Sequence, residues 1–129
     1  MQVATRRALV ARLRPLDPVV ELAVGRRTDV AAALAETNDV TATDVYDRSV
    51  PPGVWFVRDD LTAPDHAVYD GAAGLYGLNL PEELQRPALE LAEAVDAAFA
   101  FTTLGSESPA VAVRRRETLP AETLFWARE

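Results

Sequence analysis

The chain has 129 residues, 49% of them hydrophobic, and carries a formal net charge of −7 at pH 7. This length is sufficient for one hydrophobic core and too short for a separate substrate domain, so we expect one domain spanning residues 1–129. The chain has no cysteine, which excludes disulfides, thiolate metal sites and cysteine nucleophiles. Because His66 is the single histidine, multi-histidine metal centres are excluded as well, and no metal site is expected.

All 13 cationic residues are arginine, against 20 acids. Two origins of this composition stay open: a GC-rich genome, or a high-salt cytoplasm in which an acidic surface remains hydrated. The negative charge argues against a nucleic-acid-binding face, since phosphate contacts need a clustered basic patch. The densest basic run, residues 114–116, falls in a predicted strand whose side chains alternate between faces, which favours a solvated sheet edge. No run is long enough to span a membrane and the N-terminus lacks a signal peptide's apolar core, so a cytoplasmic protein is expected.

The first third of the chain is predicted to form a helix, a strand, a turn and a second helix. A helix is predicted over residues 5–13, because its apolar side chains recur on one face and Pro15 ends it. A strand follows at residues 19–22. The turn at residues 23–27 contains glycine, and the Ala and Leu content of residues 29–36 predicts a second helix.

Two further strands are predicted at residues 40–43 and 54–57. Only nine residues separate Asp44 from Val54, and they include two prolines. A full crossover helix does not fit there, so this part of the α/β unit is reduced to a loop.

The last half of the chain adds two strands, the longest helix and a hairpin. A strand rich in small residues is predicted at residues 71–78, a helix at 81–96 and a fifth strand at 98–102. Residues 110–116 and 123–128 fit an antiparallel hairpin. The predicted fold class is therefore α/β: a compact, Rossmann-like, mostly parallel sheet of the methyltransferase type with a C-terminal antiparallel hairpin.

Polar residues follow the ends of the predicted parallel strands. Glu21 ends the first strand, Asp44 the second, Asp60 follows the third and Asn79 the fourth. Parallel strands present their carboxyl ends at one edge of the sheet, the edge at which open α/β sheets bind ligands. The pattern predicts a nucleotide-type pocket, although an acid at a strand end can instead cap the following turn.

The same segments carry a resemblance to a known family. The residues concerned are 19–25, 42–44, 57–64, 75–84 and 103–107, and the most specific piece is the double acid Asp59 and Asp60 followed by Leu, Thr, Ala and Pro. They resemble an uncharacterised archaeal protein family, number 146 of the UPF series. This family has a Rossmann fold similar to that of S-adenosylmethionine-dependent methyltransferases and no assigned activity.

The resemblance to methyltransferases implies a cofactor-binding role for five residues. Glu21 would organise the Gly-rich loop, Gly25 would let the backbone approach the cofactor, and Asp44 would accept both ribose hydroxyls. Asp60 would accept the adenine amino group, and Asn79 would lie nearest the transferred methyl group. The implied cofactor is S-adenosylmethionine, an adenosine-type small molecule.

The departures from the methyltransferase pattern leave the function open. Ala23 replaces the first loop glycine, Thr28 stands near the third, and Leu80 interrupts the Asn-Pro-Pro type motif. The leading interpretation is an active or degenerate S-adenosylmethionine-dependent methyltransferase-like domain that binds a nucleoside; no catalytic residue is assigned. The alternative is a non-catalytic interaction module with a vestigial pocket, which assembles with a protein partner or as a homodimer. An NAD-binding protein is a third interpretation, which the missing glycines disfavour.

Overall fold

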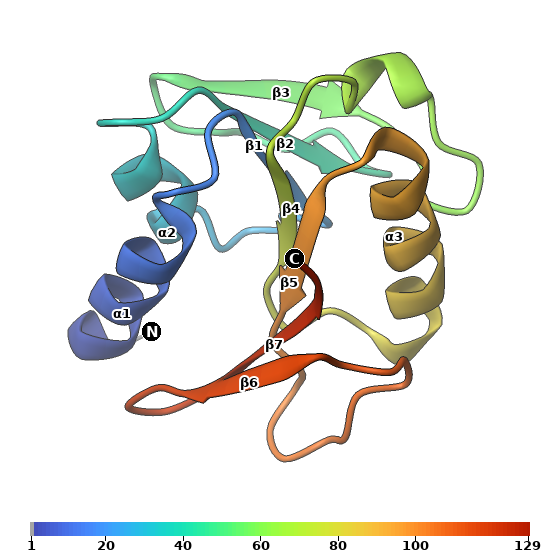
Figure 1. The fold of residues 1–129 in the computed structure, drawn as a ribbon. Helices are drawn as coiled ribbons and strands as arrows, with labels where there is room; N and C mark the ends of the chain where they lie inside the picture. The colour runs from blue at the N-terminus through green and yellow to red at the C-terminus, as the bar shows by residue number, and fades with distance from the viewer. Residues whose placement is uncertain (1) are drawn as a thin grey trace.

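The computed structural model describes residues 2–129 and contains a seven-stranded sheet with helices on both faces (Figure 1). The α-helices are α1 (Val3–Leu13), α2 (Asp29–Leu34) and α3 (Glu82–Val95), and a short 3-10 helix, η1, spans His66–Val68. The strands are β1 (Val19–Leu22), β2 (Val40–Asp44), β3 (Val54–Arg58), β4 (Gly74–Gly77), β5 (Ala98–Phe101), β6 (Arg115–Thr118) and β7 (Thr123–Arg128).

The strand order is β3-β2-β1-β4-β5-β7-β6. Strands β1 to β5 are parallel, whereas β7 runs antiparallel to both β5 and β6. Strand β1 lies between β2 and β4. The predicted fold class, a mostly parallel sheet of the methyltransferase type with a C-terminal antiparallel hairpin, is confirmed.

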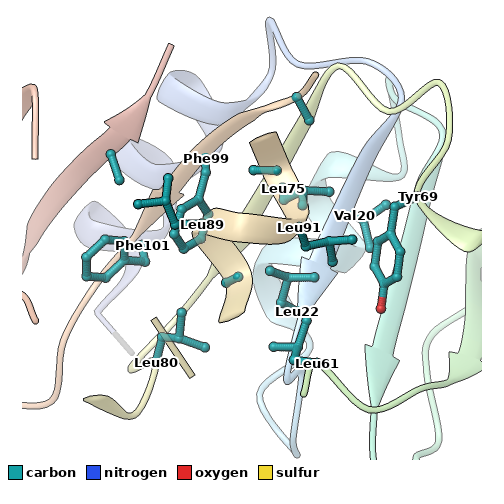
Figure 2. Close-up of a cluster of buried hydrophobic side chains, with 14 of the residues drawn as sticks. Val20, Leu22, Leu61, Tyr69, Leu75, Leu80, Leu89, Leu91, Phe99 and Phe101 are labelled. Carbon is teal, nitrogen blue, oxygen red and sulfur yellow. The ribbon is translucent and has the colours of Figure 1, made fainter. Parts of the chain in front are cut away.

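Helices α1 and α2 cover one face of the sheet and α3 covers the other (Figure 1). Successive strand side chains point to opposite faces, so Val19 joins the buried cluster under α1 and α2, while Val20 and Leu22 join the cluster under α3. Figure 2 shows the α3-side cluster, in which leucines of the sheet meet Leu89 and Leu91 of α3. All four residues of β4 are buried, as is typical of a parallel strand covered on both faces.

Several predicted boundaries were wrong. Strand β6 begins at Arg115 instead of residue 110, because the backbone N–H of Ala110 donates to the Gln85 side chain (2.6 Å) and is held against α3. Strand β4 begins three residues later than predicted, since Gly71 adopts a positive φ of 80° in the preceding turn. Helix α1 begins earlier, at Val3, and α2 is shorter than predicted, ending at Leu34.

The two edge strands differ in character. Arg115 and Arg116 of β6 lie over the rings of Trp126 and Phe125, which belong to opposite buried clusters, so the predicted alternation of faces is confirmed. The other edge strand, β3, carries Trp55, whose side chain is 70% exposed. Over residues 2–129, the helices are all too short or too polar to cross a bilayer.

Candidate functional site

The four polar residues predicted from the strand ends lie at one edge of the sheet. Glu21 is the third residue of β1, Asp44 the last of β2, and Asp60 and Asn79 each follow their strand by two residues. Because β1 to β4 are parallel, these positions share the carboxyl edge. The sequence therefore located this edge correctly; the side chains, however, divide between two separate surroundings.

The turn after β1 has the backbone shape of a glycine-rich loop. Gly25 has a φ of 59° and Ala23 a φ of 51°, so alanine occupies a left-handed position that normally favours glycine. The nearest atom to a Cβ built on Gly25 would be 4.0 Å away, and the loop backbone is open on that side. Glycine is therefore favoured at position 25 by the positive φ and not by a lack of space for a side chain.

Asp44 holds the loop in place. Its Oδ2 accepts a hydrogen bond from the backbone N–H of Gly25 (2.9 Å), and its Oδ1 accepts one from Tyr46 N–H (3.0 Å). Arg48 lies 3.5 Å from Oδ2. Asp44 is thus a turn cap and also the residue that organises the loop, the role that the resemblance implied for Glu21.

Glu21 is buried, with 1% of its surface exposed, on the α1 and α2 side of the sheet. Its Oε1 accepts a hydrogen bond of 2.6 Å from the hydroxyl of Tyr76. Burial raises the pKa of Glu21 to about 8, although the Tyr76 hydroxyl and the positive charge of Arg27 oppose the shift. The carboxyl group is therefore largely neutral at pH 7.

The double acid after β3 divides into an exposed and a tethered carboxylate. Asp60 is solvent-facing and accepts bonds from the N–H (2.9 Å) and hydroxyl (2.7 Å) of Thr62, which hold the pKa of Asp60 below its ordinary value. Asp59 accepts a bond of 2.6 Å from the hydroxyl of Tyr69, which is itself fully buried. Figure 2 shows that Tyr69 belongs to the apolar layer that also contains Leu61.

A small cavity lies at the ends of β2 and β3, and we call it the strand-end cavity. Its volume is about 50 Å³, and its walls are mostly apolar. The lining residues are Ala23, Thr43, Asp44, Val45, Asp59, Leu61 and Leu84. Asp59 lines this cavity, whereas Asp60, the acid singled out in the sequence analysis, does not.

Asn79 belongs to a different group of residues. It has a φ of 48° and donates its backbone N–H to the Thr102 hydroxyl (2.8 Å). In the amide orientation that satisfies both partners, its Nδ2 donates to the Thr103 carbonyl and its Oδ1 accepts from Arg27, each at 3.1 Å. Arg27 also donates to Glu122 (3.0 Å), so one guanidinium connects the β1–α2 loop, the β4–α3 turn and the β6–β7 hairpin.

These residues line the larger cavity at this end of the sheet, the α1-side cavity, with a volume of about 430 Å³. Its walls are Gln2, Thr5, Arg27, Asn79, Ala121 and Glu122. The sequence analysis missed Arg27 and Glu122, because they are 95 residues apart and no local spacing relates them. Glu21 and Gly25 line neither cavity.

Comparison with solved structures defines the class of fold. A magnesium protoporphyrin IX methyltransferase from Synechocystis, solved with bound S-adenosylmethionine, matches with a TM-score of 0.68 at 15% identity, covering 97% of this chain and 78% of that one. A TehB-like S-adenosylmethionine-dependent methyltransferase from Corynebacterium glutamicum matches with a TM-score of 0.64 at 14% identity, covering 99% and 89%. The fold is therefore that of the Rossmann-like S-adenosylmethionine-dependent methyltransferases.

Comparison at the sequence level defines the family. The model of the uncharacterised protein family UPF0146 matches residues 3–129, and the chain belongs to this family. A UPF0146 protein of Halobacterium salinarum is 51% identical over 112 residues, 86% of this chain and 87% of the relative. One from Archaeoglobus fulgidus is 42% identical over 80 residues, 61% and 62% of the two chains. The resemblance seen in the sequence is confirmed.

Proposed function

We propose that this protein binds S-adenosylmethionine or a closely related adenosine compound at the carboxyl edge of β1 to β3. The observation that carries the proposal is the link between the β1–α2 loop and β2. Ala23 and Gly25 both have positive φ, and the Asp44 carboxylate at the end of β2 holds the loop through Gly25 N–H. A carboxylate fixed beside such a loop, on a methyltransferase-like fold, is suited to accept the ribose hydroxyls.

Asp44 retains acceptor capacity for a ligand. Each of its oxygens accepts one backbone hydrogen bond, whereas an ionised carboxylate has about four lone-pair sites. Val45, Leu61 and Leu84 would contact the adenine ring, and Asp59 would accept its amino group in place of the Asp60 expected from the resemblance. Gly25 would contribute its open backbone, and Glu21 would act only as a neutral group packed near Arg27.

The two cavities indicate how the ligand would be accommodated. Ligand pockets usually measure about 300–1,000 Å³, so the strand-end cavity of about 50 Å³ must open by movement of its apolar side chains. The α1-side cavity of about 430 Å³ already has the required size. We propose that it receives the charged end of the ligand beside Arg27 and Asn79.

Methyl transfer would need an acceptor held about 3–3.5 Å from the methyl carbon, and positioning alone contributes at most about 7–11 kcal/mol. The α1-side cavity is open, and the loops around it are short. We therefore propose binding as the function of the chain itself, with turnover on free amines, phenols or thiols low or absent unless a partner completes the site.

The test is a calorimetric titration in molar potassium chloride with S-adenosylmethionine, S-adenosylhomocysteine, adenosine and NAD. Asp44→Asn should weaken binding of the adenosine compounds by about 10- to 150-fold, the range for a hydrogen bond to a charged group. Asp47→Asn is the matched control, because Asp47 is an exposed acid three residues further along. Its affinity should equal that of the parent.

The unliganded stability of each variant separates binding from folding. Asp44→Asn also disturbs the cap of the loop, so its thermal midpoint without ligand has to be measured together with its affinity. If the parent binds none of the four compounds, the proposal fails and the assembly module with a vestigial pocket becomes the better interpretation. Tighter binding of NAD than of each of the other three compounds would instead favour the dinucleotide interpretation.

A further inference from the structure

The N-terminal segment has a charge opposite to that of the rest of the chain. Residues 2–16 contain four arginines and no acid, in a chain whose net charge is −7. The sequence argument against a nucleic-acid face relied on that net charge and on the placement of the densest basic run, residues 114–116, in a strand. Both arguments ignore where a helix places its side chains in space, and the structure shows that placement for α1.

Three of these arginines surround one groove between α1 and α2, with a volume of about 360 Å³. Arg6, Arg7 and Arg14 line it together with Val10, Ala11 and Ala33. Within residues 2–129 the side chains of these three arginines form no ion pair or hydrogen bond, and no acid lines the groove. Arg12, by contrast, points to the hairpin and pairs with Glu117. The groove therefore has a positive charge that the protein itself leaves unneutralised.

We propose that this groove, the α1–α2 groove, binds the phosphate backbone of a single-stranded nucleic acid. Arg7 and Arg14 are seven residues apart, so they lie on the same helix face about 10.5 Å from each other along the axis. At this separation the two guanidinium groups would bind different phosphates along one strand. A guanidinium group can bind phosphate oxygens through two parallel hydrogen bonds. Arginines that have no partner in the protein keep the N–H donors for these bonds available.

The shape and composition of the groove select this class of partner. A helix that binds a membrane needs large exposed apolar residues, and Val3 is the sole exposed large hydrophobic side chain described in α1. A double helix is too wide to enter a groove between two packed helices. The groove has no aromatic residue on which a base could stack, so recognition should depend on the backbone and not on the sequence.

The groove shares helix α1 with the α1-side cavity. Gln2 and Thr5, on the opposite side of the same helix, line that cavity beside Asn79. A strand held in the α1–α2 groove would therefore lie on the element that forms one wall of the proposed ligand site. The inference itself does not depend on adenosine binding, and the two proposals can fail separately.

The experiment is a fluorescence anisotropy titration of labelled single-stranded RNA of about 12 nucleotides, as oligouridine and oligoadenosine, over a range of salt concentrations. The parent should bind both RNAs equally, and the logarithm of its affinity should fall with that of the salt concentration with a slope of about −2, from three arginines at about −0.7 each. The double substitution Arg7→Gln and Arg14→Gln should reduce the slope by about 1.4 and weaken binding at least roughly tenfold at about 0.1 M salt.

The matched control is the double substitution Arg86→Gln and Arg114→Gln. These two arginines are also exposed and have no side-chain partner in the described structure, and the change in net charge is the same. The control should keep the parent's affinity and salt slope. Equal weakening by both double variants, failure of the parent to bind RNA, or equally tight binding of poly-glutamate or of vesicles containing anionic phospholipid would each overturn the proposal.

Discussion

At the scale of single residues, Glu21 links the stability of the protein to pH. Its pKa is about 8 in the folded protein, against an ordinary value of 4.5, so between these pH values the folded state binds a proton that the unfolded state has lost. The contribution of Glu21 to the free energy of unfolding is therefore largest below about pH 4.5. It falls as the pH rises to 8, by up to about 1.4 kcal/mol per pH unit.

We therefore predict that Glu21→Gln abolishes this fall and is more stable than the parent at pH 8. Glutamine cannot ionise and can still accept the hydrogen bond from the Tyr76 hydroxyl. Denaturant unfolding at several pH values from 5 to 9 measures the effect. The control is Glu90→Gln, because Glu90 is an exposed glutamate on α3, and this variant should follow the parent. Parallel pH profiles for Glu21→Gln and the parent would contradict the prediction.

Ala23 is strained in the folded protein. A residue with a Cβ in the left-handed region costs about 1–2 kcal/mol, and glycine avoids this cost while losing more chain entropy on folding. We predict that Ala23→Gly raises the free energy of unfolding by about 0.5–1 kcal/mol. The same exchange in helix α2, Ala32→Gly, should lower the free energy of unfolding by a similar amount. Guanidinium unfolding measures both changes. Midpoints that move in the same direction for the two variants would refute this explanation.

At the scale of the secondary structure elements, β4 shows why a central strand is rich in small residues. A Cβ built on Gly74 would overlap the side chain of Leu16, in the segment that connects α1 to β1. Glycine at this position therefore lets that segment pack directly on the sheet. The space between the two residues is fully used, as is usual in protein interiors.

We predict that Gly74→Ala destabilises the protein by about 1–3 kcal/mol, the usual cost of overpacking. The cost should largely disappear when Leu16 is also replaced by alanine, because the two substitutions act on the same space. A double-mutant cycle of denaturant unfolding measures this coupling. Additive effects of the two substitutions would show that the close contact with Leu16 does not explain Gly74.

At the scale of the whole molecule, the net charge of −7 couples stability to salt. The acids repel one another over a screening length of about 10 Å at 0.1 M salt and of about 3 Å at 1 M. We predict a higher thermal midpoint in 3 M than in 0.1 M potassium chloride, measured by circular dichroism. Sulfate is unsuitable for this comparison, because it strengthens the burial of apolar surface in proteins generally.

A variant with fewer acids tests the cause of the salt effect. Glu36, Asp47 and Glu90 are exposed and have no side-chain partner in the described structure. Replacing them with the corresponding amides should reduce the rise in midpoint between the two salt concentrations. A rise of the same size as in the parent would mean that the salt acts through something other than charge repulsion.

The sequence by itself determined the class of fold, because strand and helix periodicities, turn residues and the shared carboxyl edge of parallel strands are all local signals. The positions of Asp44 and Asn79 at that edge followed from the same signals, whereas family membership followed from the resemblance of several segments to a known family. The tertiary structure decided which groups meet. Glu21 contacts Tyr76 across 55 residues and Arg27 contacts Glu122 across 95, and no spacing in a sequence encodes such contacts. The burial of Glu21, the position of Asp59 at the strand-end cavity, and the gathering of three unpaired arginines in one groove all depend on how layers pack on the sheet.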